Sequence, residues 1–336
     1  MFASKRRRAG IVAGTVALVA GLAAGCASSA NPQGDSGSSG SGGDDTFVVG
    51  YSQSNNAEPY RAQLNIQLKY YMKQYEDLKL LPITDAQQDS SKQVSQVQNF
   101  IAQGVDVLIV SPNESAPLTA PVKQACAKDI PVIILDRTVN TDCYSSFIGG
   151  DNVEAGRKAG ELAVKLLPNG GNVVELQGIL SNQPQIDRDK GFRQAIKGHP
   201  DIKIVKHREA KWLKQDATQV MNQWLSQGTK IDLVYSQNDP MALGAYLAAA
   251  SVNKQDQIKF IGTDGLAIPD GGIRAVQQGK LAGTFIYPTG SKEAAQTAEK
   301  LANGKDVKKN VTLPIQAVTS DNAAKLYKKY DFSKKG

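Results

Sequence analysis

The sequence predicts an α/β protein with two lobes, each a doubly wound parallel β-sheet covered by helices. Short β-branched runs alternate with helical patterns from residue 46 to residue 330, which is typical of β-α units. These runs form two groups of four, and within a group they recur roughly every 30 residues, the length of one such unit. The folded part, about 290 residues, is also longer than one hydrophobic core usually organises.

The predicted strands follow in order along the chain. The first group covers residues 47–52, 80–84, 105–111 and 132–136, and the second covers 173–176, 202–206, 232–235 and 259–262. We expect one lobe to contain residues 47–149 plus 287–308, and the other to contain residues 150–286 plus 309–330.

One helix of the first group is echoed in the second. Residues 96–104 read QVQNFIAQG and residues 219–228 read QVMNQWLSQG. Both segments end in glycine, which commonly terminates helices, so the residue preferences that helices share could explain the similarity. The same position before the third strand of each group favours duplication of one lobe.

The chain continues beyond the second group with a run at 282–287, a helical segment at 292–302, a strand near 311–318 and a short final helix. These elements are too few for a third domain. We interpret them as crossovers that return to the first lobe and back, which makes a hinge of several chain segments.

Residues 1–25 are predicted to be a lipoprotein signal peptide. Basic residues 5–8 precede an apolar stretch, 11–24, that is too short to cross a bilayer comfortably. The sequence LAAGC at 22–26 resembles a lipoprotein cleavage site, which would make Cys26 the lipidated first residue of the mature chain. An ordinary secretory signal with an incidental Cys26 is the alternative. Residues 26–45, rich in Ser, Gly and Asp, are expected to form a flexible tether.

The charge of the chain argues against a nucleic-acid partner. The formal net charge of +7 falls by four, to +3, when the four basic residues of the signal peptide are removed. Basic residues elsewhere are interspersed with acids, and no basic stripe carries interleaved aromatic residues. We expect an exported monomer that is held at the outer face of the cytoplasmic membrane by lipid alone.

Two further cysteines, Cys126 and Cys143, would then lie in a compartment that does not reduce thiols. We predict a disulfide between them, with two unpaired thiols as the alternative, because spacing along the chain does not determine their separation in space.

Signatures of enzymes are missing from the sequence. It has no phosphate loop, dinucleotide fingerprint, nucleophile elbow or metal-ligand cluster. The two histidines, His199 and His207, lie around a predicted edge strand, where solvated surface positions are expected. We therefore expect neither cofactor nor metal, and no catalytic residue.

Polar residues directly follow three of the predicted strands: Asp136-Arg137, Asn238-Asp239 and Asp264-Gly265. In open parallel sheets the ligand lies at the carboxyl ends of the strands. Asp and Asn are also common helix N-caps, and we interpret Asp239, which precedes a proline and a long helix, as a cap. Asp136, Asn238 and Asp264 are predicted to contact a ligand.

Motifs along the whole folded part resemble the ribose-binding group of periplasmic sugar-binding proteins. They are PVIILDR at 131–137, GGDN at 149–152, DRDKGF at 187–192, NDPMALGA at 238–245 and GTDG at 262–265. Others are similar to the galactofuranose-binding protein of sugar ABC importers: YSQ at 51–53, YR at 60–61, DAQQ at 85–88, GVD at 104–106 and VVELQG at 173–178.

The resemblance implies the type I periplasmic-binding-protein fold and a monosaccharide ligand. The first lobe would hold the sugar with Asp136 and Arg137, and the second with Arg188, Asn238 and Asp264. Carboxylates accept hydrogen bonds from hydroxyls, while guanidinium and amide groups donate them.

The remaining candidates come from the same resemblance. Tyr60 would cover the apolar face of the sugar, with Arg61 beside it, and Asp85 is a weaker candidate. Tyr60 could instead be a core residue, and Arg188 could instead pair with acids on a surface helix.

The resemblance further implies a solute-binding lipoprotein that delivers a pentose or hexose, furanose forms included, to the permease and ATPase of an ABC importer. A receptor that presents the sugar to a membrane sensor is the main alternative. A glycoside hydrolase with Asp136 and Asp264 as acid and base is disfavoured, because Arg and Asn donors beside each carboxylate would keep both ionised. Closure of the lobes is expected, since the predicted contacts come from both halves.

Overall fold

The computed structural model describes residues 46–333 and residue 335. The predicted signal peptide at 1–25, the lipidation site Cys26 and the tether at 26–45 lie outside the described residues. Within the described part, every helix is too short or too polar to cross a membrane.

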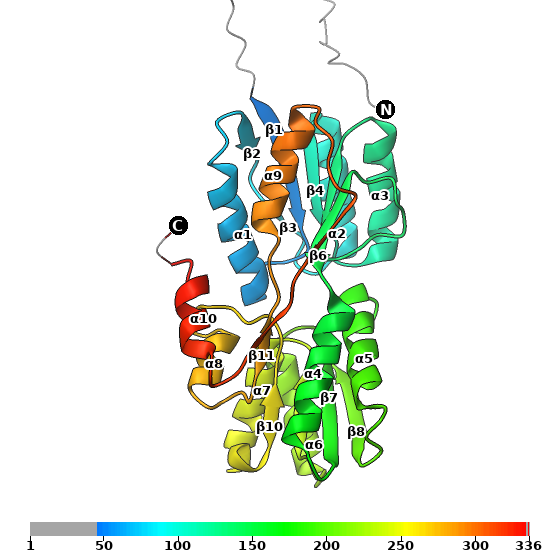
Figure 1. Cartoon of the computed structure of the whole chain (residues 1–336). Helices are drawn as coiled ribbons and strands as arrows, with labels where there is room; N and C mark the ends of the chain where they lie inside the picture. Colours follow the sequence, from blue (N-terminus) through cyan, green and yellow to red (C-terminus); the bar gives the residue numbers. More distant parts are fainter. Residues whose placement is uncertain (1–45, 334, 336) are drawn as a thin grey trace, which may run out of the picture. The chain divides into compact units, whose positions relative to one another are not determined.

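The first lobe is built on a parallel sheet with the order β12-β6-β5-β4-β1-β2, in which the short β3 also pairs with β1. The strands are β1 (Phe47–Gln53), β2 (Leu78–Leu80), β3 (Thr84–Asp85), β4 (Val107–Ser111), β5 (Val132–Leu135), β6 (Ser146–Gly150) and β12 (Asn310–Leu313). Helices α1 (Pro59–Met72) and α9 (Ser291–Ala302) pack together on one face, and α2 (Ser90–Gln103) and α3 (Ser115–Ala127) pack together on the other (Figure 1).

The second lobe repeats this plan with a sheet of order β10-β9-β7-β8. Its strands are β7 (Gly171–Gln177), β8 (Ile202–Glu209), β9 (Leu233–Ser236) and β10 (Lys259–Ile261), all parallel. Its helices are α4 (Asn152–Leu166), α5 (Gln183–Ile196), α6 (Lys214–Ser226), α7 (Asp239–Ala250) and α8 (Gly272–Gln277). Helix α4 packs on α5, and α6 packs on α7.

The predicted fold class is confirmed, and the residues explain it. The central strands β4 and β5 are buried along their whole length, which is typical of a parallel sheet covered on both faces. Helix α2 begins at Asp89, whose side chain accepts from the backbone N–H groups of Ser91 and Lys92, and it ends at Gly104 with φ of 67°.

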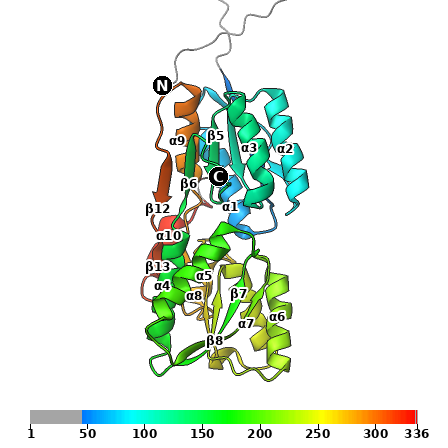
Figure 2. The ribbon, with the colours of Figure 1, turned by 90° about the vertical axis from the view of Figure 1, so that its right-hand side faces the viewer.

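The chain crosses between the lobes three times (Figures 1 and 2). The first crossover joins β6 to α4. The second joins β11 (Thr284–Ile286), which pairs with β13 (Gln316–Val318) beside the second lobe, to α9 in the first lobe. The third joins β12 to β13, and α10 (Ala323–Tyr330) then packs on α8.

Two predicted strands were wrong in their extent. The expected strand at 311–318 is two strands, because Pro314 separates β12, which pairs with β6, from β13, which pairs with β11. The chain therefore returns to the second lobe after Leu313, and the expected boundary at residue 309 is corrected. The expected strand at 80–84 is likewise divided into β2 and β3, with Pro82 between them.

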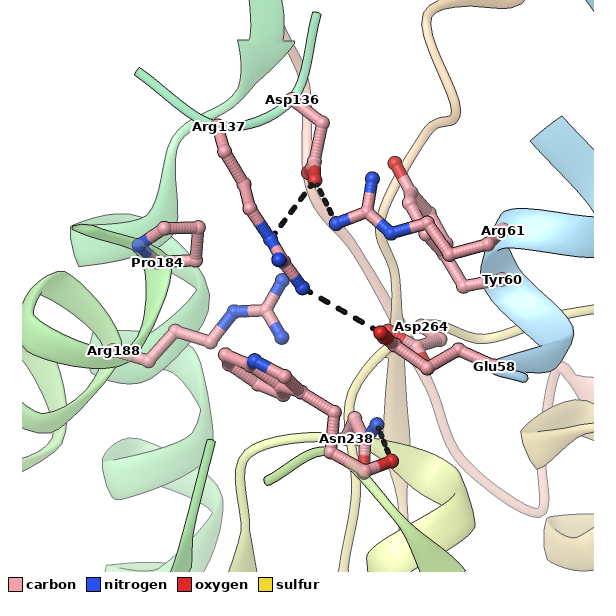
Figure 3. Close-up of a pocket in the computed structure, with 10 residues that line it drawn as sticks. Glu58, Tyr60, Arg61, Asp136, Arg137, Pro184, Arg188, Asn238 and Asp264 are labelled. Carbon is pink, nitrogen blue, oxygen red and sulfur yellow. Dashed lines mark hydrogen bonds and ion pairs between the residues drawn. The ribbon is translucent and has the colours of Figure 1, made fainter. Parts of the chain in front are cut away.

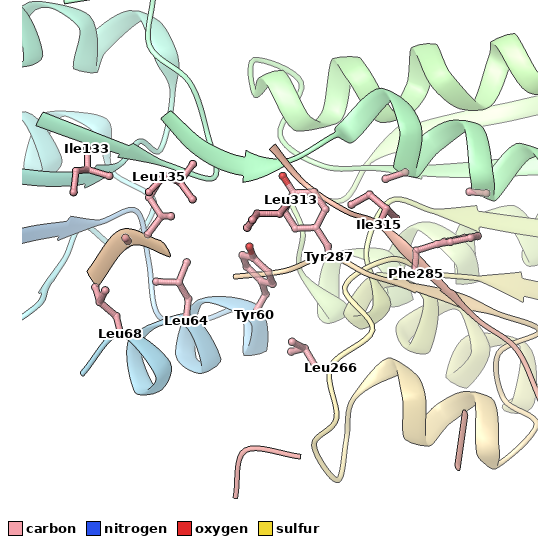
Figure 4. Close-up of a cluster of buried hydrophobic side chains, with 14 of the residues drawn as sticks. Tyr60, Leu64, Leu68, Ile133, Leu135, Leu266, Phe285, Tyr287, Leu313 and Ile315 are labelled. Atoms are coloured by element: carbon pink, nitrogen blue, oxygen red, sulfur yellow. The ribbon is translucent and has the colours of Figure 1, made fainter. Parts of the chain in front are cut away.

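One hydrophobic cluster runs from the first lobe through the crossovers into the second (Figure 4). It contains Leu64, Leu68, Ile133 and Leu135 of the first lobe together with crossover residues, Tyr287, Leu313 and Ile315. The crossovers also contact one another, since the Tyr287 hydroxyl accepts from the backbone N–H of Gly150 at 3.1 Å. The hinge is thus anchored in apolar packing.

Candidate functional site

A pocket lies between the lobes, at the carboxyl ends of both parallel sheets (Figure 3). Its lining residues are Glu58, Tyr60, Arg61, Asp136, Arg137, Pro184, Arg188, Trp212, Asn238 and Asp264. Seven of the eight predicted ligand-contacting residues are among them. Asp85 is not: its carboxylate accepts from the backbone N–H of Gln87 at 2.8 Å in a turn beside β3.

The first-lobe wall is a buried ion-pair network. Asp136 follows β5 with φ of 68°, and its Oδ2 lies 2.6 Å from Arg61 Nη2 and 3.9 Å from Arg137 Nε. Arg137 Nη2 lies 3.5 Å from Glu58 Oε1. Each cation of this wall therefore has a carboxylate partner within the protein.

Burial acts differently on the two guanidinium groups of this wall. Burial, supported by the neighbouring Arg61, lowers the pKa of Arg137 to about 10, which leaves it charged at neutral pH. Burial opposes the charge of Arg61 too, but Asp136 and Glu58 outweigh it and hold the pKa of Arg61 above its usual value. Arg61 Nε has no partner among the described residues.

The second-lobe wall has no such pairs. Arg188 projects from α5 and is 4% exposed, which removes the alternative of a surface ion pair. Its Nε donates to Asn152 Oδ1 at 2.9 Å and its Nη1 donates to the carbonyl of Gln237 at 2.6 Å. The guanidinium also lies over the Tyr287 ring, 4.7 Å from its centroid. Neutral groups thus hold this cation in place.

Among the described lining residues, Asp264 carries the unsatisfied hydrogen-bond acceptor of the pocket. It follows β10, its backbone N–H donates to the carbonyl of Phe285 at 3.0 Å, and its buried Oδ2 has no hydrogen-bond donor among the described residues. Burial, followed by the repulsion of Asp239, raises the pKa of Asp264 well above its usual value. The expectation that donors satisfy both pocket aspartates is therefore wrong for Oδ2 of Asp264.

The cap of α7 is Asn238, which also lines the pocket, whereas we predicted Asp239 as the cap. Asn238 caps α7 by accepting from the backbone N–H of Met241 at 3.0 Å, while its amide donates to the carbonyl of Trp212. Asp239, expected to be the cap, lies behind the pocket and accepts from Gly265 N at 2.8 Å and Thr284 Oγ1 at 2.6 Å. Its carboxylate supports the loop that carries Asp264, and burial raises its pKa to about 6.

Two aromatic rings line the pocket, and one of them was missed. Tyr60 is both a core and a pocket residue, and its hydroxyl donates to the carbonyl of Pro288 at 3.0 Å. Trp212 follows β8, and the centroid of its ring lies 5.9 Å from the guanidinium group of Arg137 and 5.5 Å from that of Arg188. We predicted that this strand ended at residue 206, whereas β8 reaches Glu209, so Trp212 was not recognised as a residue at a strand end.

The loop before α5 is shaped to admit this tryptophan. A Cβ atom at Gly178 would lie 2.0 Å from the Trp212 ring, so only glycine fits there. Trp212 itself adopts a φ of 69°, and its indole Nε1 donates to Asn182 Oδ1 at 3.0 Å. The ring orientation is therefore determined by its surroundings.

Cys126 and Cys143 are joined by a disulfide, with Cα atoms 6.1 Å apart. It connects the end of α3 to the loop that begins with Asp136 and Arg137. The first-lobe wall is therefore attached covalently to a neighbouring helix.

Donors, acceptors and ring faces in a pocket lined by both lobes suit a small polyhydroxylated molecule. Among the described residues, no cluster of His, Cys, Asp and Glu could hold a metal ion. Both histidines lie away from the pocket, and His207 is exposed on β8, an edge strand.

Residues 49–306 match the family model of the periplasmic binding protein domain. The xylitol-binding protein of Mycolicibacterium smegmatis is 34% identical over 241 residues, 70% of this chain and 68% of that protein. The ribose import binding protein RbsB of Escherichia coli is 33% identical, over 71% of this chain and 79% of its own length. Among solved structures, the fructose binding periplasmic domain of a hybrid two-component system superimposes with a TM-score of 0.82 at 34% identity, covering 86% of this chain and 95% of that domain.

Proposed function

The chain belongs to the periplasmic binding protein family, whose members bind substrates and are not enzymes, and on that premise we propose that it captures a monosaccharide or related polyol and delivers it to an ABC importer. The glycoside hydrolase alternative is thereby set aside. Similarity to import binding proteins supports the transport role.

The observation that carries the proposal is the composition of the pocket. Asp136, Arg137, Arg188 and Asp264 come from opposite lobes yet line one cavity, which also has the faces of Tyr60 and Trp212. The unsatisfied Oδ2 of Asp264 needs a donor, and a sugar hydroxyl supplies one. Arg188 and Asn238 provide donors for neighbouring sugar oxygens.

Calorimetry on the purified chain tests this proposal. The titrants are D-ribose, D-fructose, xylitol, myo-inositol and a furanose-locked methyl galactoside. This panel is chosen because the sequence motifs resemble those of proteins that bind pentoses, hexoses and furanoses. At least one should bind with a Kd of roughly 10 μM or tighter, and Asp264→Ala should weaken it about 30-fold. Failure of the whole panel, together with binding of an acidic or aromatic solute, would contradict the proposal.

We propose that the chain acts as a monomer on the outer face of the cytoplasmic membrane, anchored by lipid on Cys26. The motif at residues 22–26 supports this anchor. Replacing Cys26 with serine should release the protein from the membrane fraction, and unchanged retention would contradict lipidation at this residue. Light scattering of the released protein measures its mass.

A receptor that presents the sugar to a membrane sensor is the second candidate, favoured by similarity to the sensor-domain structure described above. Deletion of the gene separates the two roles. Loss of uptake of the radiolabelled sugar indicates transport, whereas intact uptake with loss of the transcriptional response indicates sensing.

A further inference from the structure

Asn182 joins the two lobes beside the pocket without lining it. It stands immediately before α5, where asparagine commonly caps a helix, but its side chain makes no capping hydrogen bond. Instead Nδ2 donates across the cleft to the backbone carbonyl of Asn113 at 2.6 Å, and Oδ1 accepts from Trp212 Nε1 at 3.0 Å. The side chain is 1% exposed, so both bonds are shielded from water.

The carbonyl of Asn113 receives donors from both lobes. Besides Asn182, Arg137 Nη1 donates to it at 3.2 Å. The Asn113 backbone is itself held in place, because its N–H donates to Gln93 Oε1 at 2.7 Å and its side-chain amide donates to Ser90 Oγ at 3.0 Å. A carbonyl oxygen has two lone pairs, so it can serve both donors, but only while the lobes are together.

A second cross-cleft bond lies next to the first. The Glu114 carboxylate accepts from Ser181 Oγ of the second lobe at 2.6 Å and from Ser90 Oγ of its own lobe at 2.7 Å. These two bonds, in that order, lower the pKa of Glu114. Ser181 is exposed, so its bond competes with water and should hold the lobes together less than Asn182 does.

We propose that Asn182 is a positioning residue for closure of the lobes. Its two hydrogen bonds form together only when the lobes are closed and the Trp212 ring and the Arg137 guanidinium group face the pocket. Asn182 thereby controls how long a bound sugar stays. The part that concerns sugar residence rests on the proposed function. The part that concerns closure does not, because each bond joins protein groups.

Spin labels test closure without any sugar. Cysteines introduced as Asn99→Cys on α2 and Gln219→Cys on α6 place one label on each lobe, at the edge away from β12 and β13 (Figure 2). In the ligand-free protein, Asn182→Ala should increase the population at long label distances several-fold, and Ser181→Ala should increase it less. Asn322→Ala is the matched control, because it removes an asparagine amide that also donates to a backbone carbonyl, that of Ala317 at 3.1 Å, away from the cleft, and it should leave the distances unchanged.

Identical distance distributions in Asn182→Ala and the parent would overturn the proposal, whichever sugar the protein binds. An equal effect of Asn322→Ala would also overturn it, since that bond does not cross the cleft.

Stopped-flow fluorescence tests residence time. The chain has two tryptophans, so Trp224→Phe leaves Trp212 as the only emitter. With xylitol and D-ribose as probes, Asn182→Ala and Asn182→Asp should each raise the dissociation rate constant about tenfold and leave the association rate constant within about twofold. Asn182→Asp keeps the acceptor for Trp212 Nε1 but loses the donor to Asn113, so its Trp212 emission should match the parent.

An unchanged dissociation rate constant, or a loss confined to association, contradicts the role in residence. If neither xylitol nor D-ribose, nor any other sugar in the calorimetric panel, binds the parent, the proposed function fails, while the spin-label distances still decide whether Asn182 controls closure.

Discussion

The two walls of the pocket bury charge in different ways. In the first lobe, Arg61 and Arg137 are paired with Asp136 and Glu58. In the second, Arg188 is held by the neutral oxygens of Asn152 and Gln237, and within the described residues Asp264 has no donor for its Oδ2.

The difference indicates that the two walls contribute differently to ligand binding. An internally paired wall is formed before the ligand arrives, so it positions the ligand but gains little new electrostatic energy from it. A wall with an unsatisfied acceptor gains most when a hydroxyl enters, because the desolvation of that acceptor is then offset. We therefore expect substitutions in the first lobe to affect folding most, and those in the second to affect binding most.

The largest expected effect is on folding, from the loss of Arg61. Arg61→Met leaves buried Asp136 with only Arg137 at 3.9 Å, and should lower the free energy of unfolding by about 3–5 kcal/mol. Arg188→Met, the matched substitution in the second wall, removes hydrogen bonds to the neutral oxygens of Asn152 and Gln237 and should lower it by only about 1 kcal/mol. Urea unfolding of both variants measures the contrast, and equal losses would abolish it.

The disulfide should also stabilise the first wall. Replacing Cys126 and Cys143 together by alanine opens a loop closed over a separation of 17 residues, and should lower the free energy of unfolding by about 3 kcal/mol. The unfolding midpoint in urea measures this, and intact mass after alkylation without reductant verifies the bond in the parent. Two alkylated thiols in the parent, or an unchanged midpoint in the variant, would contradict this prediction.

Asp264→Asn should change folding and binding in opposite directions. Replacing a buried carboxylate whose Oδ2 has no donor among the described residues should raise the free energy of unfolding of the ligand-free protein by about 1 kcal/mol, while sugar affinity falls about 30-fold. Asp136→Asn, the first-lobe counterpart, should lower both quantities. The same sign for the two variants in urea unfolding would show that the walls do not differ.

The pH dependence of stability follows from the raised pKa of Asp264. Above the unfolded pKa, about 3.9, the unfolded chain loses this proton while the folded protein keeps it, so the free energy of unfolding falls as pH rises toward the folded value. The Asp264→Asn variant should lack this component, which urea unfolding across that range measures.

A smaller effect is expected on binding itself. Burial and Asp239 raise the pKa of Asp264, with smaller contributions in the same direction from Glu58 and Asp136, while Arg188 opposes them. A sugar hydroxyl that donates to the carboxylate favours the ionised form, so binding should release up to one proton and affinity should rise with pH. Calorimetry in buffers of different ionisation enthalpy detects the proton. Equal release by Asp264→Asn would assign it to another group.

Most of the fold and the pocket could be predicted because both follow from the parallel sheet. Strand ends at one edge of each sheet bring Asp136, Arg137, Asn238 and Asp264 together, whatever the loops do in detail. Local signals were weaker where the chain leaves the sheet. Trp212 was missed because its strand is longer than its apolar pattern.

Other features of the site depend on contacts that are remote in sequence. The pKa of Asp264 depends on Asp239 behind it, and the position of the Arg188 guanidinium group depends on a hydrogen bond to Asn152, 36 residues away. No pattern in the neighbouring residues reports either contact. The assignment of β12 to the first sheet had a local signal, Pro314, but the partner strand β6 was not anticipated at all.

The place of β12 has a consequence for how the protein is made. The first sheet is complete only when Asn310–Leu313 pairs with β6, so until then β6 is an unpaired edge. During synthesis from the N-terminus, the first lobe cannot be completed before almost all of the second lobe has been synthesised. The two lobes are therefore completed together, late in synthesis. A chain interrupted before residue 310 exposes the edge of β6, with which other chains can pair.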